Sequence, residues 1–224
     1  YEAALPQHGW PNWVLGNHDQ PRLASRVGLA QARVAAVLLL TLRGTPTMYY
    51  GDEIGMPNVP IPPDCVHDPV EKRVPGKGMG RDPQRTPMQW SAEPHAGFSP
   101  SGSWLPIASD FATRNVEDQE DDSTSMLSLY RRLIDLRRRS DALSIGDYSP
   151  LPATGNVLAY VRRHTDRRFV VILNLGSDAE QFSSALTISG RIAVSTHGER
   201  EGEVVSLPIK LRGDEAIVIQ CDAD

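Results

Sequence analysis

The stretch Trp13-Val-Leu-Gly-Asn-His-Asp-Gln-Pro-Arg22 decides how the rest of this sequence is interpreted. It contains most of a short apolar run, Trp10 to Gly16, which stops abruptly at consecutive polar residues. A brief run of aromatic and β-branched residues that ends in this way is typical of a buried strand with polar groups at its carboxyl end. The sequence therefore predicts a strand whose last residues present amide, imidazole and carboxylate groups.

The pattern outward from this strand changes to a helix and then back to a strand. Residues Ser25 to Arg43 are rich in Ala, Leu and Val, and Gly44 stands where a helix C-cap is expected. Thr45 to Tyr50 is again strand-like and ends in Gly51-Asp-Glu53. The order is strand, helix, strand, with both strands finishing in polar residues, as in a β/α unit.

A long irregular segment follows. Between Met56 and Pro106 lie 11 of the 18 prolines of the chain, and neither a helix nor a central strand tolerates them there. A loop of this length in a compact domain usually has a function. An acidic stretch, Glu117 to Asp122, is expected to form a solvated approach to the next helix, Met126 to Arg139, whose Leu and Met residues recur at helical spacing.

The chain from about Gly146 onward has an all-β pattern of short apolar runs separated by Gly, Asp, Asn and charged residues. This spacing predicts a small antiparallel sandwich or barrel. The expected strands are residues 157–161, 169–175, 186–188, 192–194, 204–207 and 216–219.

Composition excludes several classes of protein. The 224 residues are 40% hydrophobic and 23% charged, and acidic residues outnumber basic ones by 28 to 23, with no basic tract for nucleic acid. The longest strongly apolar stretch, Val34 to Leu42, is well below the ~20 residues needed to cross a bilayer, so no membrane partner is expected. Cys65 and Cys221 form no ligand or disulfide pattern, which favours a reducing, cytoplasmic location. Because the sequence opens at Tyr1 without an initiator Met, we expect the true N-terminus to lie upstream.

Three ordered motifs resemble the α-amylase superfamily, glycoside hydrolase family 13. Residues 13–22 resemble its fourth conserved region, and Gly44-Thr-Pro-Thr-Met-Tyr-Tyr-Gly-Asp-Glu-Ile-Gly55 is similar to its last conserved strand. Gly80-Arg-Asp-Pro-Gln-Arg-Thr-Pro-Met-Gln-Trp90 resembles the α-glucosidase branch, as do residues 68–76 and the helix Leu129 to Arg137.

The resemblance implies an α/β plus all-β fold. Residues 1–143 would be the C-terminal portion of a (β/α)₈ TIM barrel, containing strands seven and eight with their helices. Residues 144–224 would be the small antiparallel β-sandwich called domain C. Two β/α units cannot close a barrel, and a complete barrel needs roughly 250 residues, so the upstream part of the same barrel is the expected partner.

The resemblance also assigns roles. It implies that the parent protein is a retaining glycoside hydrolase that releases glucose from short α-glucosides. Asp19 would stabilise the transition state, and His18 would donate to hydroxyls of the same sugar, with Asn17 as a possible further contact. Arg85 is preferred for an additional sugar contact, while Arg81 competes with it, since spacing does not separate the two. The nucleophile and the acid/base would lie outside this chain, and no metal or cofactor is expected.

Other interpretations remain open. Taken without the three motifs, Asn17, Asp19 and Pro21 would be read as the start of a helix. A transglycosidase or isomerase such as a trehalose synthase would use the same residues, and the heavy chains of amino-acid transporters share the fold without the activity. A stand-alone sugar-binding module is a third possibility. Asp52 and Glu53 are not expected to flank one bond together, because adjacent residues on a strand point to opposite faces.

Overall fold

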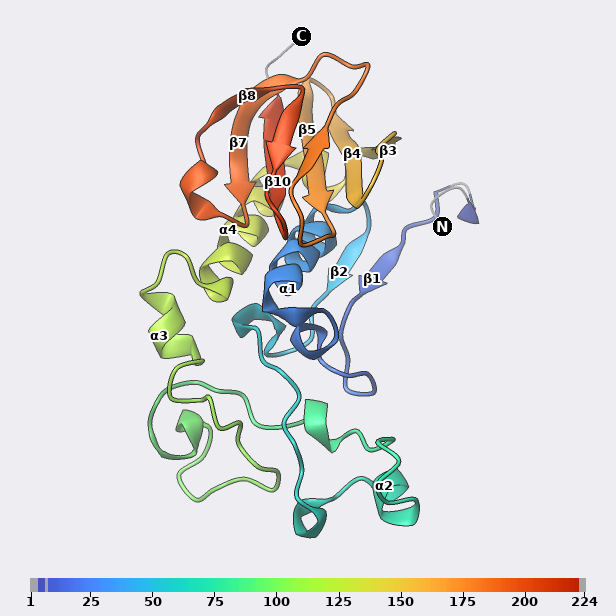
Figure 1. The fold of residues 1–224 in the computed structure, drawn as a ribbon. Coiled ribbons are helices and arrows are strands. Elements are labelled where there is room, and N and C mark those ends of the chain that lie inside the picture. The colour runs from blue at the N-terminus through green and yellow to red at the C-terminus, as the bar shows by residue number, and fades with distance from the viewer. Residues whose placement is uncertain (1–3, 7, 222–224) are drawn as a thin grey trace. The chain divides into compact units, whose positions relative to one another are not determined.

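The computed structural model describes residues 4–6 and 8–221, coloured along the chain in Figure 1. The chain divides into two compact units. The first comprises the chain up to Val14, the segment Arg33–Thr47 and the chain from Leu129 onward. The second comprises Leu15–Ala32 and Met48–Ser128.

Two parallel strands of the first unit form the expected strand–helix–strand unit. Strand β1 (Asn12–Val14) pairs with β2 (Thr45–Thr47), and helix α1 (Leu23–Thr41) connects them. A parallel pair needs a crossover of this kind. The prediction that Gly44 is the helix C-cap is wrong, because the helix ends at Thr41. Gly44 has a φ of 126°, and a Cβ at this position would lie 2.6 Å from the Pro11 carbonyl oxygen. Glycine is therefore required where the chain turns into β2.

Helix α1 is long and apolar enough to cross a membrane by length and composition, with a mean hydropathy of 1.5 over its best window. It is interrupted at Gly28, where φ is 78° and ψ is 161°. Its C-terminal half is packed inside the first unit, with Val34, Ala36 and Val37 fully buried. That half therefore has the character of a core helix.

The helix Met126 to Arg139 is confirmed with the expected bounds and is labelled α4. Arg137 from its last turn donates to the carbonyl oxygens of Leu40, Leu42 and Gly44. These carbonyls belong to the end of α1 and the turn after it, which have few partners of their own. The arginine at the end of α4 thus completes the C-terminus of α1. A short helix α5 (Asp141–Ser144) follows.

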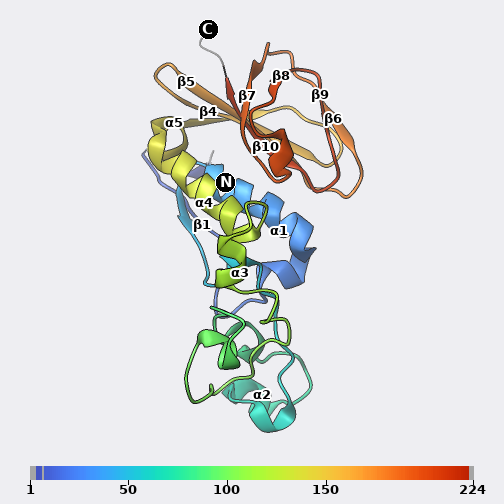
Figure 2. The same cartoon turned by 90° about the vertical axis from the view of Figure 1, so that its left-hand side faces the viewer.

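Two antiparallel sheets make up the rest of the first unit (Figure 2). The six-stranded sheet has the order β3-β4-β5-β10-β7-β8, and β6 pairs with β9 in a two-stranded sheet. Both sheets contribute to one apolar cluster that includes Ile172, Ile217, Phe182 and Leu211. The strands are β3 (Asp147–Leu151), β4 (Val157–His164), β5 (Arg167–Asn174), β6 (Glu180–Phe182), β7 (Ser189–Ser195), β8 (Val204–Ser206), β9 (Ile209–Leu211) and β10 (Ala216–Cys221).

The prediction of a strand at residues 186–188 is wrong. The backbone N–H of Leu186 donates to Ser184 Oγ at 3.1 Å, which is typical of a turn, and the next strand begins at Ser189. Ile188 is buried in the core although it lies outside a strand. Strands β3, β6 and β9 were not expected, since β6 and β9 have three residues each and β3 contains Pro150. Proline is compatible with β3 because it is an edge strand.

The second unit consists mainly of the expected irregular segment. Apart from the first half of α1 and the start of α4, its regular pieces are short: α2 (Pro69–Arg73), α3 (Val116–Glu120) and the 3₁₀ turns η2 (Asp52–Ile54), η3 (Pro63–Cys65), η4 (Asp82–Gln84) and η5 (Pro94–Gly97). Its apolar core comprises Ile54, Met56, Met88 and Leu127.

Polar side chains satisfy much of the backbone in this unit. Gln89 donates to the Arg114 carbonyl at 2.7 Å, and Gln119 donates to the Ile54 carbonyl at 3.0 Å. The acidic stretch Glu117 to Asp122 was expected to be a solvated approach to the next helix, but most of it forms α3. Asn115 caps this helix, because its Oδ1 accepts from the Asp118 backbone N–H at 2.8 Å. An irregular segment can stay ordered when its backbone groups find such partners.

A buried hydroxyl pair joins the helix α1 to the six-stranded sheet. Thr41 Oγ1 and Tyr160 Oη lie 2.5 Å apart, and Tyr160 is 0% exposed. The neighbouring Arg162, also 0% exposed, donates to the carbonyls of Thr41, Gly146 and Asp147. Burial raises the pKa of the Tyr160 phenol above its usual range, so the hydroxyl stays protonated.

We expect Thr41→Val to lower the free energy of unfolding by about 1–3 kcal/mol, because it leaves the buried Tyr160 hydroxyl without this partner. Adding Tyr160→Phe should recover part of the loss, since both polar groups are then absent. Urea unfolding followed by circular dichroism measures both effects. The matched control is Thr154→Val at an exposed site of the same unit, and equal losses at positions 41 and 154 would contradict the assignment.

Candidate functional site

A tight turn follows β1 and carries the candidate residues of the first motif. Asn17 Oδ1 accepts a hydrogen bond from the backbone N–H of Asp19 at 2.8 Å, and the N–H of Gln20 donates to the Asn17 carbonyl at 3.4 Å. An Asn side chain that bonds the backbone two residues on is typical of an Asx turn. Helix α1 begins only at Leu23. Asn17 therefore shapes the turn and does not start the helix.

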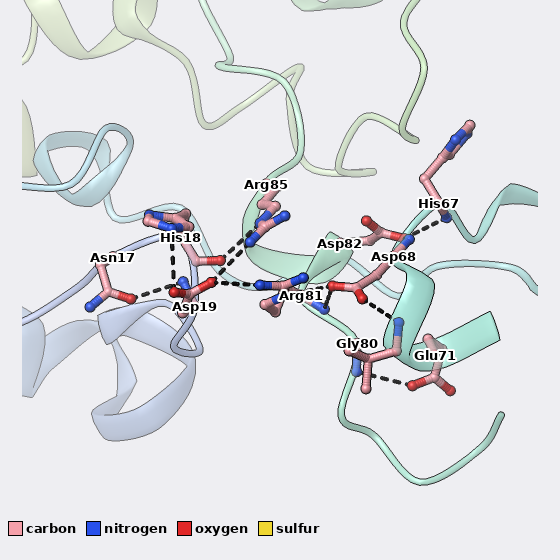
Figure 3. A network of polar contacts seen from close by, with 11 residues as sticks. Asn17, His18, Asp19, His67, Asp68, Glu71, Gly80, Arg81, Asp82 and Arg85 are labelled. Atoms are coloured by element: carbon pink, nitrogen blue, oxygen red, sulfur yellow. Dashed lines mark hydrogen bonds and ion pairs between the residues drawn. The ribbon is translucent and has the colours of Figure 1, made fainter. Parts of the chain in front are cut away.

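The Asp19 carboxylate is the centre of the polar network in Figure 3. Its Oδ1 accepts from Arg85 Nη2 at 2.9 Å and from Arg81 Nη1 at 3.2 Å, and its Oδ2 lies 3.3 Å from His18 Nε2. The side chain remains 47% exposed. The carboxylate is thus neither packed into the interior nor used to cap a helix, and it stays open to a ligand.

The charges around Asp19 keep it ionised. Partial desolvation alone would raise the pKa of its carboxyl group, but the hydrogen bond from Arg81, the charge of His18 and the bond from Arg85 outweigh that effect. The net result is a pKa below the usual value for aspartate. Opposite charges within a few ångströms favour the charged form in this way. The site therefore holds a stable negative charge facing solvent.

The two arginines stand at the two ends of the η4 turn. Arg81 precedes η4 and Arg85 follows it, and the Arg85 backbone N–H donates to the Asp82 carbonyl at 3.0 Å. This turn directs both guanidinium groups to the same carboxylate oxygen. Arg85 also donates from Nε to the His18 carbonyl at 2.9 Å, so it contacts the backbone as well as the side chain of the first motif. Both arginines therefore contact Asp19, and the preference for Arg85 over Arg81 as the sugar contact stays a prediction.

Arg22 fixes the other end of the turn. It is 0% exposed, donates from Nη1 to the Tyr50 carbonyl at 2.6 Å and lies 4.6 Å from the centre of the Tyr50 ring. Its backbone N–H donates to Asn58 Oδ1 at 2.8 Å. The hydroxyl of Tyr50 in turn donates to the Thr86 carbonyl at 2.7 Å, next to Arg85. The first and third motifs are thus connected through the second.

Asp52 and Glu53 do not lie on a strand, so the argument that strand alternation points them to opposite faces is wrong. They lie in η2, between Gly51 at a φ of 85° and Gly55 at a φ of 69°. Burial raises the pKa of Asp52 to about 6, although the charge of Arg22 opposes this, and burial also raises the pKa of Glu53. A Cβ on Gly16 would lie 2.9 Å from Asp52 Oδ2. Asp52 therefore packs directly beneath the turn that carries Asp19.

An open cavity of about 380 Å³ lies beside Arg85. Its wall includes Tyr50, Trp90, Phe98 and Trp104. Trp90, the last residue of the third motif, therefore belongs to a cavity wall. Among the described residues, no group of three or more His, Cys, Asp and Glu side chains could hold a metal ion.

The structure brings all the candidate side chains of the sequence together except that of Asn17, which is turned toward the Asp19 backbone. It also shows a residue that the sequence analysis gave no role: Asp68, whose carboxylate is hydrogen bonded to Arg81 (Figure 3). The dipeptide Asp68-Pro69 is typical of a capped helix start, but Arg81, the partner of the Asp68 carboxylate, lies 13 residues away along an aperiodic loop. Sequence spacing could not reveal that contact.

Comparison with known proteins identifies related sequences. Over 209 residues the chain is 34% identical to a glucan 1,6-alpha-glucosidase of Streptococcus pneumoniae, a match that covers 83% of this chain and 38% of that protein. It is 35% identical over 208 residues to the human amino acid transporter heavy chain SLC3A1, covering 90% of this chain and 29% of that protein. The chain therefore spans well under half the length of these relatives.

A solved structure and a family model extend the comparison. A mutant of the trehalulose synthase MutB superimposes with a TM-score of 0.88 at 26% identity, covering 99% of this chain and 45% of that one. The model of the alpha-amylase catalytic domain matches residues 1–146. This match includes β1, α1, β2, η4 and every residue of the Asp19 network. The chain accordingly belongs to the α-amylase family, glycoside hydrolase family 13.

Proposed function

We propose that this chain supplies the transition-state-stabilising aspartate and part of the first sugar subsite of a retaining, α-glucosidase-type glycoside hydrolase. The observation that carries the proposal is the half-exposed Asp19 carboxylate, held by Arg81 and Arg85 on the turn after β1. Glucan 1,6-alpha-glucosidase and maltase among the relatives support an α-glucoside as the substrate class.

The chemistry follows from the position of the charge. Glycoside cleavage with retention passes through a transition state in which the sugar ring is flattened and carries positive charge. A carboxylate that binds the hydroxyls beside the reacting carbon interacts more strongly with that state than with the ground state, and this difference accelerates the reaction. His18 would donate to the same sugar, and the guanidinium of Arg85 would orient its hydroxyls without losing charge.

The same proposal assigns the parts of the fold. We assign β1 and β2 to strands seven and eight of a (β/α)₈ barrel, residues 1–143 to that barrel and residues 144–224 to a C-terminal β-sandwich domain. A barrel places its active site at the carboxyl ends of the strands, which is where the turn with Asp19 follows β1. The nucleophile and the acid/base would be supplied by another part of the barrel.

A second candidate is a transglycosidase or sugar isomerase. It is favoured by the similarity to trehalulose synthase MutB, a mutant of which has been solved in complex with its substrate sucrose. Such an enzyme would use Asp19 in the same role and would differ in whether water or a sugar hydroxyl attacks. The heavy-chain relative offers a third, non-catalytic role. The assembled contacts of Asp19 with two arginines argue against that role.

We expect residues 1–224 alone to show no turnover of an aryl α-glucoside, because two of the three carboxyl groups that the mechanism needs would be missing. Release of the aryl group is measured by absorbance. The control is the same chain with Asp19→Asn, which identifies contaminating activity. Turnover that depends on Asp19 in the chain alone would contradict the proposal.

In the full-length enzyme, Asp19→Asn should lower kcat by about 100- to 1,000-fold while KM changes much less, because the lost interaction belongs mainly to the transition state. Steady-state kinetics on an aryl α-glucoside measures both constants. Asp64→Asn, at an exposed acid in the second unit, is the matched control and should leave both constants unchanged. A large rise in KM with an unchanged kcat would mean that Asp19 only binds the ground state.

Product analysis separates hydrolysis from isomerisation. Given maltose or isomaltose, the full-length enzyme should release glucose as the main product, and given sucrose it should form little rearranged disaccharide. Chromatography of the products over time measures the ratio. Trehalose or trehalulose as the main product would establish the second candidate in place of the first.

A further inference from the structure

We propose that Asp68 is a positioning residue of this site: its buried carboxylate fixes the Arg81 guanidinium toward Asp19. This inference rests on the proposed function for its catalytic consequence. The contacts that carry it lie within the second unit and are drawn in Figure 3, where Asp68 and Asp19 stand on either side of Arg81.

Asp68 holds Arg81 at two points. Its Oδ2 accepts from Arg81 Nε at 2.7 Å and from the backbone N–H of Arg81 at 3.0 Å. The side chain of Asp68 is 0% exposed, whereas that of Arg81 is 36% exposed. The bond to the backbone N–H fixes the position of the Arg81 main chain, and the bond to Nε fixes the orientation of its guanidinium plane. The Nη1 group is left facing Asp19 Oδ1 at 3.2 Å.

The charge of Asp68 is permanent under ordinary conditions. The hydrogen bond from Arg81 lowers the pKa of its carboxyl group to about 2, with further bonds from the backbone N–H groups of Val70 and Arg81 acting against the effect of burial. Hydrogen bonds to the charged form of a carboxylate favour ionisation in this way. Asp68 therefore remains an acceptor for Arg81 across the pH range in which glycosidases are assayed.

Two further carboxylates bond the backbone of the loop that contains Asp68. Asp82 Oδ2 accepts from the backbone N–H groups of His67 at 2.6 Å and Asp68 at 2.7 Å, and Asp82 is 3% exposed. Glu71 accepts from the backbone N–H groups of Gly76 at 2.7 Å and Gly80 at 3.0 Å. Hydrogen bonds between carboxylates and backbone N–H groups thus fix the loop of residues 67–80, and Arg81 follows directly at its end.

Arg85 provides an internal contrast. Its Nε bonds to the His18 carbonyl and its Nη2 to Asp19, so both contacts lie within the first motif. Arg81 instead spans Asp19 and a second carboxylate outside that motif. A substitution of Asp68 can therefore change the orientation of the Arg81 side chain while the contacts of Arg85 with His18 and Asp19 are retained.

The first test uses residues 1–224 and does not depend on activity. The carboxyl carbon of Asp19 is titrated by carbon-13 NMR in the unmodified chain, in Asp68→Asn and in Asp64→Asn. We expect Asp68→Asn to raise the pKa of Asp19 toward the usual aspartate value, because Arg81 is no longer held against it, while Asp64→Asn leaves it unchanged. An unchanged pKa in a folded Asp68→Asn chain would overturn the inference.

The second test uses the full-length enzyme in a double-mutant cycle. Asp68→Asn should lower kcat/KM roughly 10- to 100-fold through misplacement of Arg81, and it should cause little further loss in an Arg81→Gln background. Additive losses would mean that Asp68 acts only by supporting the fold, and would overturn the inference. If Asp68→Asn does not fold, Arg81→Gln alone should reproduce the shift in the pKa of Asp19.

The outcomes separate the two proposals. If the full-length enzyme cleaves no α-glucoside but the pKa of Asp19 follows Asp68, the proposed function fails and the positioning role stands. If the enzyme is active and neither its kcat/KM nor the pKa of Asp19 responds to Asp68→Asn, the positioning role alone fails.

Discussion

Two guanidinium groups converge on one oxygen of the Asp19 carboxylate, and the site depends on this contact. Arg85 and Arg81 donate to Asp19 Oδ1 from 2.9 and 3.2 Å, while the carboxylate stays 47% exposed. Exposed ion pairs contribute about 0–1 kcal/mol to stability, so the fold gains little from them. The chain nevertheless uses the turn after β1, the buried Arg22 and the η4 turn to assemble them. Such an arrangement is characteristic of a functional site, where charge is held in place before a ligand arrives.

Periodic patterns predicted the regular parts of the fold well. Helix α4 has the expected bounds, and helix α1 differs from expectation by two residues at each end, because apolar residues at helical spacing leave few alternatives. The β region was predicted as antiparallel, but residues 186–188 lie outside any strand, and β6 and β9 have only three residues each. That Asp52 and Glu53 do not jointly flank one bond stays a prediction, but the reason given for it is wrong, because they do not lie on a strand. Both lie in the 3₁₀ turn η2, where strand alternation does not apply.

Only those residues of the candidate site that lie in recognisable motifs could be predicted from the sequence. Asp19 and His18 are adjacent in sequence, so their proximity followed from the first motif. Arg85 lies 66 residues from Asp19, and only the resemblance to α-glucosidases connected them. Asp68 had no such signal, because its partner is set by the path of an aperiodic, proline-rich loop. Contacts of that kind depend on backbone turns and buried hydrogen bonds that leave no period in the sequence.

The central claim is that Asp19 binds the hydroxyl groups of the sugar whose bond is cleaved. A crystal structure of the full-length enzyme with a bound glucose-derived inhibitor tests it most directly. The account predicts that the oxygens of Asp19 lie about 2.5–2.9 Å from hydroxyls beside the anomeric carbon, with Arg85 in contact with the same ring. A sugar bound elsewhere, out of contact with Asp19, would contradict it.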